Sequence, residues 1–418
     1  MEILKNRNFT RLFAASLTSQ MGTILGNMAF VFYLLDRFSD QPGYATAAEL
    51  MSALPSVFVF FIVGVVADRF DRAKIAENSD WIRTGLTLFI LGALALDLLA
   101  LVFVLLFLRS AVSKFFVPAQ LALVQGILGE KQLMQAAGLN QMVSGVFIVF
   151  GMGLGAAAYL YLGIVWAIVI DGISMIASAL LIRSCRIPLE VRLPNGRSEW
   201  RSLGLKPVMA DFTVGMKYIL RYRLLLSIML GYLVFGLING TLAVIPMFTL
   251  KYKLVPDQYE QYMALFAIFL GVGFFLGSIV GSWALQKLKP HLVINAGLLL
   301  ISLLAVVFAM IADIWTYLIG VTLAGMCIAP VNVALGGWLP QIVDADKMGR
   351  VAAWLEPIMM LAHSIALGLV LAFYPQVISL ESAYFGLAAI TFILFVYYSW
   401  SLTKWAPETA AAQKEVEL

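Results

Sequence analysis

The chain has 418 residues, of which 62% are hydrophobic and 12% are charged, and its net charge is +4. A soluble fold with this composition would lack the polar residues needed to cover its apolar surface, whereas twelve membrane helices need about 240 apolar residues, which this chain has. The composition therefore excludes soluble enzymes, nucleic-acid-binding proteins and disordered chains, and it predicts an all-α integral membrane protein.

Uncharged runs predict twelve membrane helices in two sets of six. The first run, 12–35, follows a basic start and is too long for the apolar part of a signal peptide. The predicted helices of the first set are 12–35, 50–67, 84–96, 98–122 and two within 132–182. Those of the second set are 224–250, 261–286, 290–312, 314–343, 357–380 and 382–403.

A polar stretch, 183–223, separates the two sets, and apolar residues with helical spacing in 208–222 predict an amphipathic helix on the inner membrane surface. The expected organisation is an N-terminal bundle (1–183), a cytoplasmic linker (184–223), a C-terminal bundle (224–403) and a cytoplasmic tail (404–418).

The distribution of Lys and Arg predicts the orientation of the chain. With the N-terminus inside, 23 of the 28 basic residues fall in inner segments and three in outer segments. Basic residues concentrate on the cytoplasmic side of membrane proteins, so both termini are predicted to be cytoplasmic, with the protein in the plasma membrane.

Several kinds of chemistry are not expected from this sequence. Cys185 and Cys327 lie far apart and outside any CxxC or Cys/His cluster, so we expect two reduced thiols and no metal site. The sequence has no GxxxxGK[ST], HExxH or GxSxG motif. We therefore expect neither ATP-driven transport nor enzymatic activity, and no cofactor.

The two halves show a weak internal repeat. Three short matches recur at offsets of 217, 212 and 216 residues. Duplicated halves are typical of transporters, which bind substrate near the midplane between the halves. The matched segments are 64–68 with 281–285, Pro118 with Pro330, and 136–140 with 352–356.

The loop after the second predicted helix carries a motif, Gly64-Val-Val-Ala-Asp68-Arg69-Phe70-Asp71-Arg72-Ala73-Lys74. It resembles the loop signature of the major facilitator superfamily, G-x-x-x-D-R-x-G-R-[RK], with Asp71 in place of the usual Gly and Ala73 in place of a basic residue. The resemblance implies two pseudo-symmetric six-helix bundles that rock around a central cavity. In such a loop, Gly64, Asp68, Arg69 and Arg72 would form contacts that exist in only one of two conformations and so bias the equilibrium between them.

Weaker sequence matches to branches of the superfamily extend along the chain. The segments 80–83, 116–119 and 133–136 resemble the drug-exporting branch that includes macrolide efflux proteins. That branch implies the export of amphipathic small molecules in exchange for protons. We expect the protein to act as a monomer. The alternative is a lysophospholipid transporter or flippase of the same superfamily, which 126–130 and 329–332 resemble.

Four titratable residues inside predicted helices are candidates for proton coupling. A charge in the bilayer centre costs at least ~2.5 kcal/mol, so such residues usually face the protein interior. Arg109 matches an Arg that the superfamily's proton antiporters carry in the fourth helix, where it would alter the pKa of a neighbouring carboxylate. Asp171 is either a proton carrier or a structural partner. Glu356, expected to open the eleventh helix, and His363 complete the set.

Polar residues in the first, fourth, seventh and tenth helices are substrate-cavity candidates, because the superfamily fold lines its cavity with these helices. Gln20 and Asn27 are seven residues apart and share one face of the first helix. The alternative role for these side chains is hydrogen bonding between helices. The full set is Gln20, Asn27, Arg109, Asn239 and Asn332.

Overall fold

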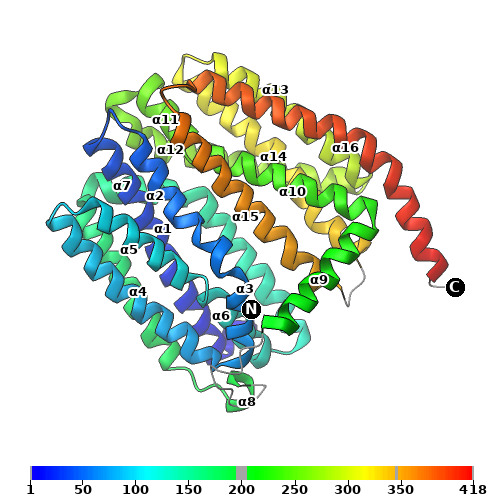
Figure 1. Cartoon of the computed structure of the whole chain (residues 1–418), viewed down its shortest axis with the longest axis horizontal. Helices are drawn as coiled ribbons and strands as arrows, with labels where there is room; N and C mark the ends of the chain where they lie inside the picture. The colour runs from blue at the N-terminus through cyan, green and yellow to red at the C-terminus, as the bar shows by residue number, and fades with distance from the viewer. Residues whose placement is uncertain (1, 194–204, 344–346, 417–418) are drawn as a thin grey trace. The chain divides into compact units, whose positions relative to one another are not determined.

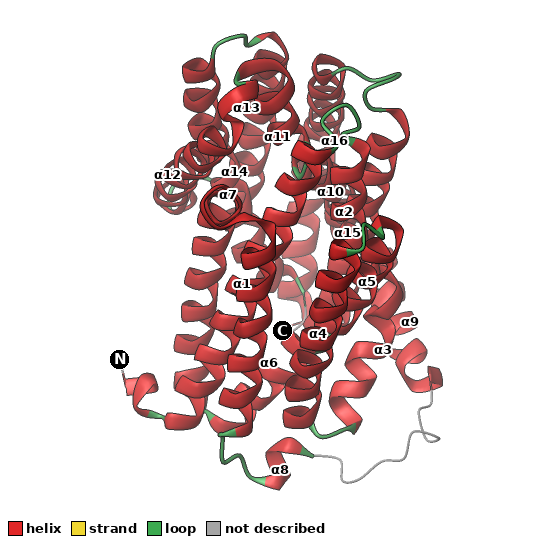
Figure 2. Ribbon diagram, turned by 90° about the vertical axis from the view of Figure 1, so that its left-hand side faces the viewer, coloured by secondary structure: helices red, strands yellow, loops and turns green. Residues whose placement is uncertain are grey.

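The computed structural model describes residues 2–193, 205–343 and 347–416, and the regular structure in these segments is helical (Figure 2). A backbone in lipid must satisfy its own hydrogen bonds, which a helix does within one segment. Among the described residues, nine helices are long and apolar enough to cross a membrane by length and composition. The predicted all-α membrane fold is confirmed at this level.

The chain divides into two compact units, Met1–Leu205 and Lys206–Leu418. Their helices can be followed by label and colour in Figure 1. The helices of the first unit are α1 (Arg7–Arg37), α2 (Gly43–Ala53), α3 (Pro55–Arg69), α4 (Arg72–Ala95), α5 (Leu99–Ser113), α6 (Phe116–Ile127), α7 (Glu130–Arg183) and α8 (Leu189–Arg192).

The helices of the second unit begin with α9 (Leu205–Arg221), which agrees with the helix predicted over 208–222. The others are α10 (Arg223–Leu242), α11 (Ile245–Thr249), α12 (Tyr259–Leu285), α13 (Pro290–Met310), α14 (Ile314–Ile342), α15 (Met348–Phe373) and α16 (Leu380–Val416). Because α16 continues to Val416, the segment predicted as a tail is helical over most of its length.

Several predicted membrane helices are interrupted in the structure. Pro55 occupies the first turn of α3 and separates it from α2, because proline has no backbone N–H to continue the preceding helix. The two helices predicted within 132–182 are both in α7, and Gly163 divides them with a φ of 74°. Only glycine adopts this conformation at little cost, so Gly163 provides the turn between them.

Both units pair their helices in the same order. In the first unit, α1 packs on α7, α2 on α5 and α4 on α7. In the second unit, α10 packs on α15, α12 on α14 and α13 on α16. In terms of predicted membrane helices, the second unit pairs its first with its fifth, its second with its fourth and its third with its sixth. The first unit pairs its second with its fourth, and its first and third both pack on α7, which holds its fifth and sixth. This shared arrangement supports the internal repeat.

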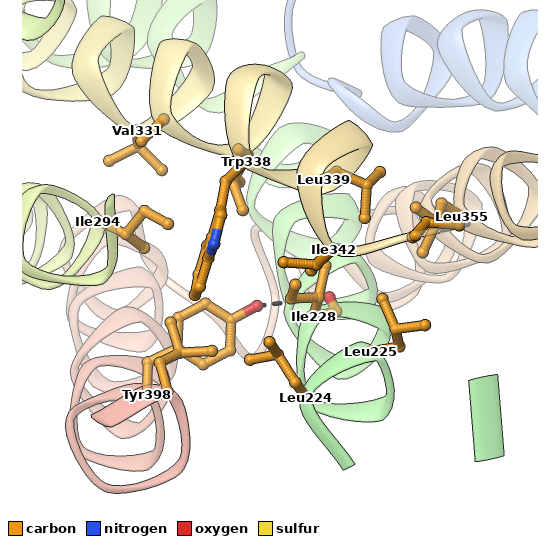
Figure 3. Packing of buried hydrophobic residues seen from close by; sticks show 14 of the residues in the cluster. Leu224, Leu225, Ile228, Ile294, Val331, Trp338, Leu339, Ile342, Leu355 and Tyr398 are labelled. Atoms are coloured by element: carbon orange, nitrogen blue, oxygen red, sulfur yellow. Dashed lines mark hydrogen bonds between the residues drawn. The ribbon is translucent and has the colours of Figure 1, made fainter. Parts of the chain in front are cut away.

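The core of the second unit packs around Tyr398 of α16 and Trp338 of α14 (Figure 3). The Tyr398 hydroxyl is completely buried and donates to the Ile228 carbonyl oxygen at 3.4 Å. A buried tyrosine hydroxyl usually forms a hydrogen bond, because an unpaired hydroxyl in an apolar core costs free energy. Figure 3 shows aliphatic side chains from α10, α13, α14 and α15 around this contact.

Candidate functional site

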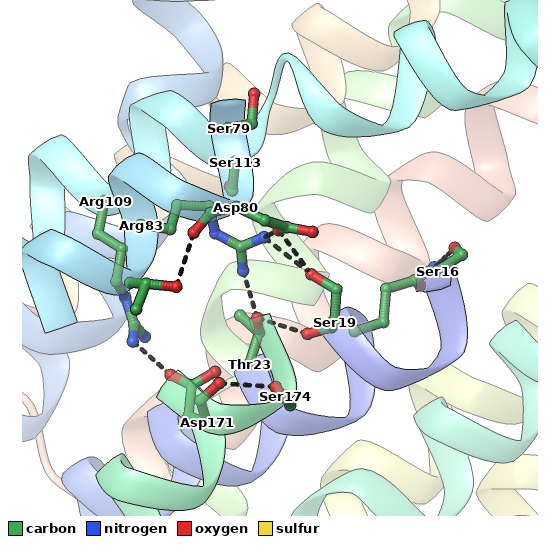
Figure 4. Close-up of polar contacts among 12 residues, drawn as sticks. Ser16, Ser19, Thr23, Ser79, Asp80, Arg83, Arg109, Ser113, Asp171 and Ser174 are labelled. Atoms are coloured by element: carbon green, nitrogen blue, oxygen red, sulfur yellow. Dashed lines mark hydrogen bonds and ion pairs between the residues drawn. The ribbon is translucent and has the colours of Figure 1, made fainter. Parts of the chain in front are cut away.

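Four charged side chains lie inside the first unit, together with several hydroxyl groups (Figure 4). They form two ion pairs, Asp80 with Arg83 and Asp171 with Arg109. Each of the four side chains is at most 6% exposed. Desolvating a charge costs several kcal/mol, so buried charges persist only when they are paired and hydrogen-bonded. We call this group, with the hydroxyl and amide groups that bind it, the polar seam.

Arg109 of α5 holds one end of the polar seam. Its guanidinium donates to the Asp171 carboxylate of α7 and to the Asn27 side-chain oxygen of α1. It also donates to the Thr87 hydroxyl of α4 at 3.3 Å. The structure thus brings together Asn27, Arg109 and Asp171, which the sequence singled out separately. It also gives Arg109 the neighbouring carboxylate that the prediction required.

Two glycines of α1 create the space for Asp171. A Cβ atom at Gly26 would lie 2.8 Å from Asp171 Oδ2, and one at Gly22 would overlap Ser174 Oγ. Small residues allow neighbouring helices to approach closely. Here they allow α7 to present a carboxylate against α1 without a clash.

Asp80 and Arg83 of α4 form the second pair. Arg83 donates to Asp80 Oδ1 at 2.9 Å and to Ser19 Oγ at 3.0 Å, and it also binds the Thr23 hydroxyl. Ser19 Oγ in turn donates to Asp80 Oδ1 at 3.1 Å. From the sequence, Asp80 and Arg83 were noted only as the ends of a segment that resembles the drug-exporting branch. Their spacing of three residues, which places them on one helix face, was the signal for an ion pair.

Other predicted site residues do not join the ion pairs in the described contacts. Gln20 donates to Ser16 Oγ at 2.6 Å, within α1. Asn239 is exposed and donates to the Phe235 carbonyl oxygen of its own helix at 2.8 Å. Asn332 is also exposed, and His363 is half-buried. All but Gln20 belong to the second unit.

The predicted position of Glu356 at a helix N-terminus is wrong. Helix α15 begins at Met348, so Glu356 lies more than two turns inside it and is exposed. The prediction followed from Pro357, because proline favours the first turn of a helix. In the structure, α15 contains Pro357 in its interior.

The loop with the family signature is held in place by contacts of Asp71 with α4 and α8. Asp71, at the position usually held by Gly, caps α4 by accepting from the backbone N–H groups of Ala73 and Lys74 at 3.1 and 3.2 Å. Its carboxylate also binds Arg192 of α8, with oxygen–nitrogen distances of 3.0 and 2.5 Å. The departure from the signature therefore has two structural roles.

The other residues predicted to form the gate lie at the end of α3 and the start of α4. Gly64 lies within α3, Arg69 is its last residue, and Arg72 begins α4 and donates to the Val191 carbonyl oxygen at 3.5 Å. Asp68 is in the last turn of α3, and its side chain lies outside the described residues. The gating role of the loop remains a prediction.

Two substitutions separate the roles of Asp71. Asp71→Asn keeps a side-chain acceptor for the cap and removes the half-buried ion pair, so its expected cost is below about 1 kcal/mol. Asp71→Ala removes both and should cost about 1 kcal/mol more. Thermal unfolding of the purified variants measures the difference. Equal destabilisation by the two substitutions would contradict the capping role.

Among residues 2–193, 205–343 and 347–416, no group of three or more His, Cys, Asp or Glu side chains is placed to hold a metal ion. Cys185 and Cys327 are free thiols. The chemistry of the site described so far is that of buried charge pairs and hydrogen bonds.

Comparison with known proteins identifies the family. The model of the Major Facilitator Superfamily matches residues 12–367. The chain belongs to the Major Facilitator Superfamily. It is therefore a multi-pass membrane transporter by fold and family, as the loop signature indicated.

Two relatives and one solved structure illustrate the likeness. The uncharacterized MFS-type transporter YkuC of Bacillus subtilis (strain 168) is 50% identical over 409 residues, which cover 98% of this chain and 95% of that protein. Macrolide efflux protein A of Streptococcus pyogenes is 26% identical over 182 residues, which cover 43% of this chain and 45% of that protein. The peptide transporter POT in complex with alafosfalin has a TM-score of 0.73 at 12% identity, covering 96% of this chain and 94% of that one. This last likeness concerns the fold alone.

Proposed function

We propose that this transporter exports amphipathic small molecules across the plasma membrane in exchange for protons. The buried Arg109–Asp171 pair carries the proposal. Protonation of Asp171 neutralises the carboxylate and removes the ionic partner of Arg109, which keeps contacts with Asn27 and Thr87. A proton can therefore change the charge balance inside the first unit.

The size of this effect suits a conformational switch. Breaking a buried ion pair by removing one partner costs about 3–5 kcal/mol. Moving a two-state equilibrium from 1:99 to 99:1 requires about 5.5 kcal/mol. Protonation, like removal of the partner, leaves Arg109 without an ionised carboxylate. A difference of this size between two conformations that pair Arg109 differently would cover most of that requirement.

The substrate class rests on the similarity to macrolide efflux protein A over 45% of that protein. We assign the cavity contacts to Gln20, Asn27, Asn239 and Asn332, with Glu356 and His363 as further titratable candidates. The loop with Asp68, Arg69 and Arg72 would bias the rocking of the two bundles. Each of these roles is part of the proposal.

The test uses the purified protein in liposomes with an imposed proton gradient. A cationic dye and a fluorescent lysophospholipid are followed side by side. We expect gradient-driven dye movement that a protonophore abolishes, and Asp171→Asn should remove the dependence on the gradient. Lysophospholipid movement that ignores the gradient would contradict proton antiport and would make this protein a lipid flippase.

A further inference from the structure

The arginines of the two ion pairs are hydrogen-bonded by side chains on successive turns of α1 and α4. On α1, Thr23 binds Arg83, and Asn27, one turn later, binds Arg109. On α4, Arg83 is followed one turn later by Thr87, which binds Arg109. A spacing of four residues keeps these groups on one helix face. Figure 4 shows the resulting row of polar groups between α1, α4 and α7.

Both carboxylates keep one oxygen without a hydrogen bond. Asp80 Oδ2 and Asp171 Oδ1 are buried and accept no hydrogen bond among the described residues. The Ser178 hydroxyl of α7 faces Asp80 without forming a hydrogen bond of standard geometry. A buried carboxylate oxygen without a donor is costly. A proton on that oxygen removes the charge that makes it costly.

The charged groups around Asp80 come from several elements. Arg83 of its own helix is its direct partner, and Arg109 of α5 and Asp171 of α7 act electrostatically on Arg83. Helix α6 has no charged residue, and α1 has none between Arg11 and Asp36. Helix α3 carries Asp68 and Arg69 at its C-terminal end. Asp80 and Asp171 are therefore alike: each is a buried acid with one guanidinium partner and one unpaired oxygen.

We propose that Asp80 is a second proton-carrying residue of this transporter and that it exchanges its proton with Asp171. This inference rests on the proposed proton antiport. In the exchange, the O–H bond of protonated Asp171 breaks and an O–H bond forms on Asp80, so the total charge of the polar seam is unchanged. Arg109 then regains an ionised partner while Arg83 loses one. The two pairs thus alternate, and the hydroxyls of Ser19 and Thr23 hold Arg83 when Asp80 is neutral.

The experiment compares the full-length wild type with Asp80→Asn and Asp171→Asn in liposomes. The probe is the cationic dye, and initial uptake is measured against pH under a fixed gradient. Infrared difference spectra between acidic and neutral pH report the protonated carboxyl groups of the same samples. Ser79→Ala is the matched control, because Ser79 is the buried neighbour of Asp80 on α4 and donates to the Ile75 carbonyl oxygen rather than to an ion pair.

We expect Asp80→Asn to lower gradient-driven uptake at least tenfold, to flatten its pH profile and to remove one protonated-carboxyl band, while dye binding persists. Ser79→Ala should behave like the wild type. The double variant Asp80→Asn/Arg83→Gln removes both charges, so it leaves no unpaired charge and tests the proposal even if the single variant does not fold. It should likewise lack one protonated-carboxyl band and show a flat pH profile of uptake.

The outcomes separate the two proposals. If Asp171→Asn flattens the pH profile while Asp80→Asn and its double variant keep the wild-type profile and all bands, the role of Asp80 is wrong and proton antiport stands. If neither Asp171→Asn nor Asp80→Asn changes the profile, proton antiport itself is wrong, and the role of Asp80 falls with it.

Discussion

Arg109→Met is expected to destabilise the protein by about 3–5 kcal/mol and to abolish gradient-driven uptake. The substitution leaves the Asp171 carboxylate, whose side chain is 0% exposed, without its ionic partner. An uncompensated buried charge has a cost of this size because neither water nor an opposite charge stabilises it. The thioether of Met fills much of the space of the arginine stem, so lost packing contributes little.

A charge-removing double variant is the control for this prediction. Arg109→Met/Asp171→Leu removes both charges, so most of the lost stability should return, since apolar replacements of buried ion pairs are often neutral or stabilising. Uptake should stay absent, because no titratable group remains at this pair. Denaturant or thermal unfolding and dye uptake in liposomes measure the two quantities. Wild-type uptake in the double variant would contradict the coupling role of the pair.

The membrane helices could be predicted from the sequence because long uncharged apolar runs are rare outside membrane-spanning segments. Their interruptions could not. Hydropathy treats 50–67 as one run, whereas Pro55 begins a separate helix. Gly163 lies in the middle of the uncharged run 132–170, and only the structure shows the positive φ that divides α7 there. Run length alone correctly indicated that this region holds more than one membrane helix.

The members of the candidate site could be predicted one by one, but their partners could not. Arg109 and Asp171 stand out because charges are rare in apolar helices, yet they are 62 positions apart and meet only because α5 and α7 both pack on α4. Asp80 and Arg83 precede the uncharged run 84–96, so they read as the polar start of a helix. The structure instead places them inside α4 and buries both. Burial is a tertiary property, and a spacing of three residues does not reveal it.

Gly26→Ala is expected to impair uptake strongly and to destabilise the protein by about 1–3 kcal/mol, the usual range for overpacking. The new methyl group would lie 2.8 Å from Asp171 Oδ2 and 3.0 Å from its Cβ atom. Asp171 would have to move away from α1, and this movement would weaken its contact with Arg109. The site therefore depends on a residue that has no functional group of its own.

The matched control is Gly92→Ala in α4, where a Cβ atom would meet nothing within 4 Å. Alanine is favoured over glycine in a helix interior by about 0.5–1 kcal/mol, so this variant should be as stable as the wild type or more stable, with unchanged uptake. Thermal unfolding and dye uptake of both variants give the comparison. Normal uptake in Gly26→Ala, with stability equal to that of Gly92→Ala, would show that α1 and α7 can accommodate a methyl group at position 26. The close approach of α1 to α7 would then not be what positions Asp171 against Arg109.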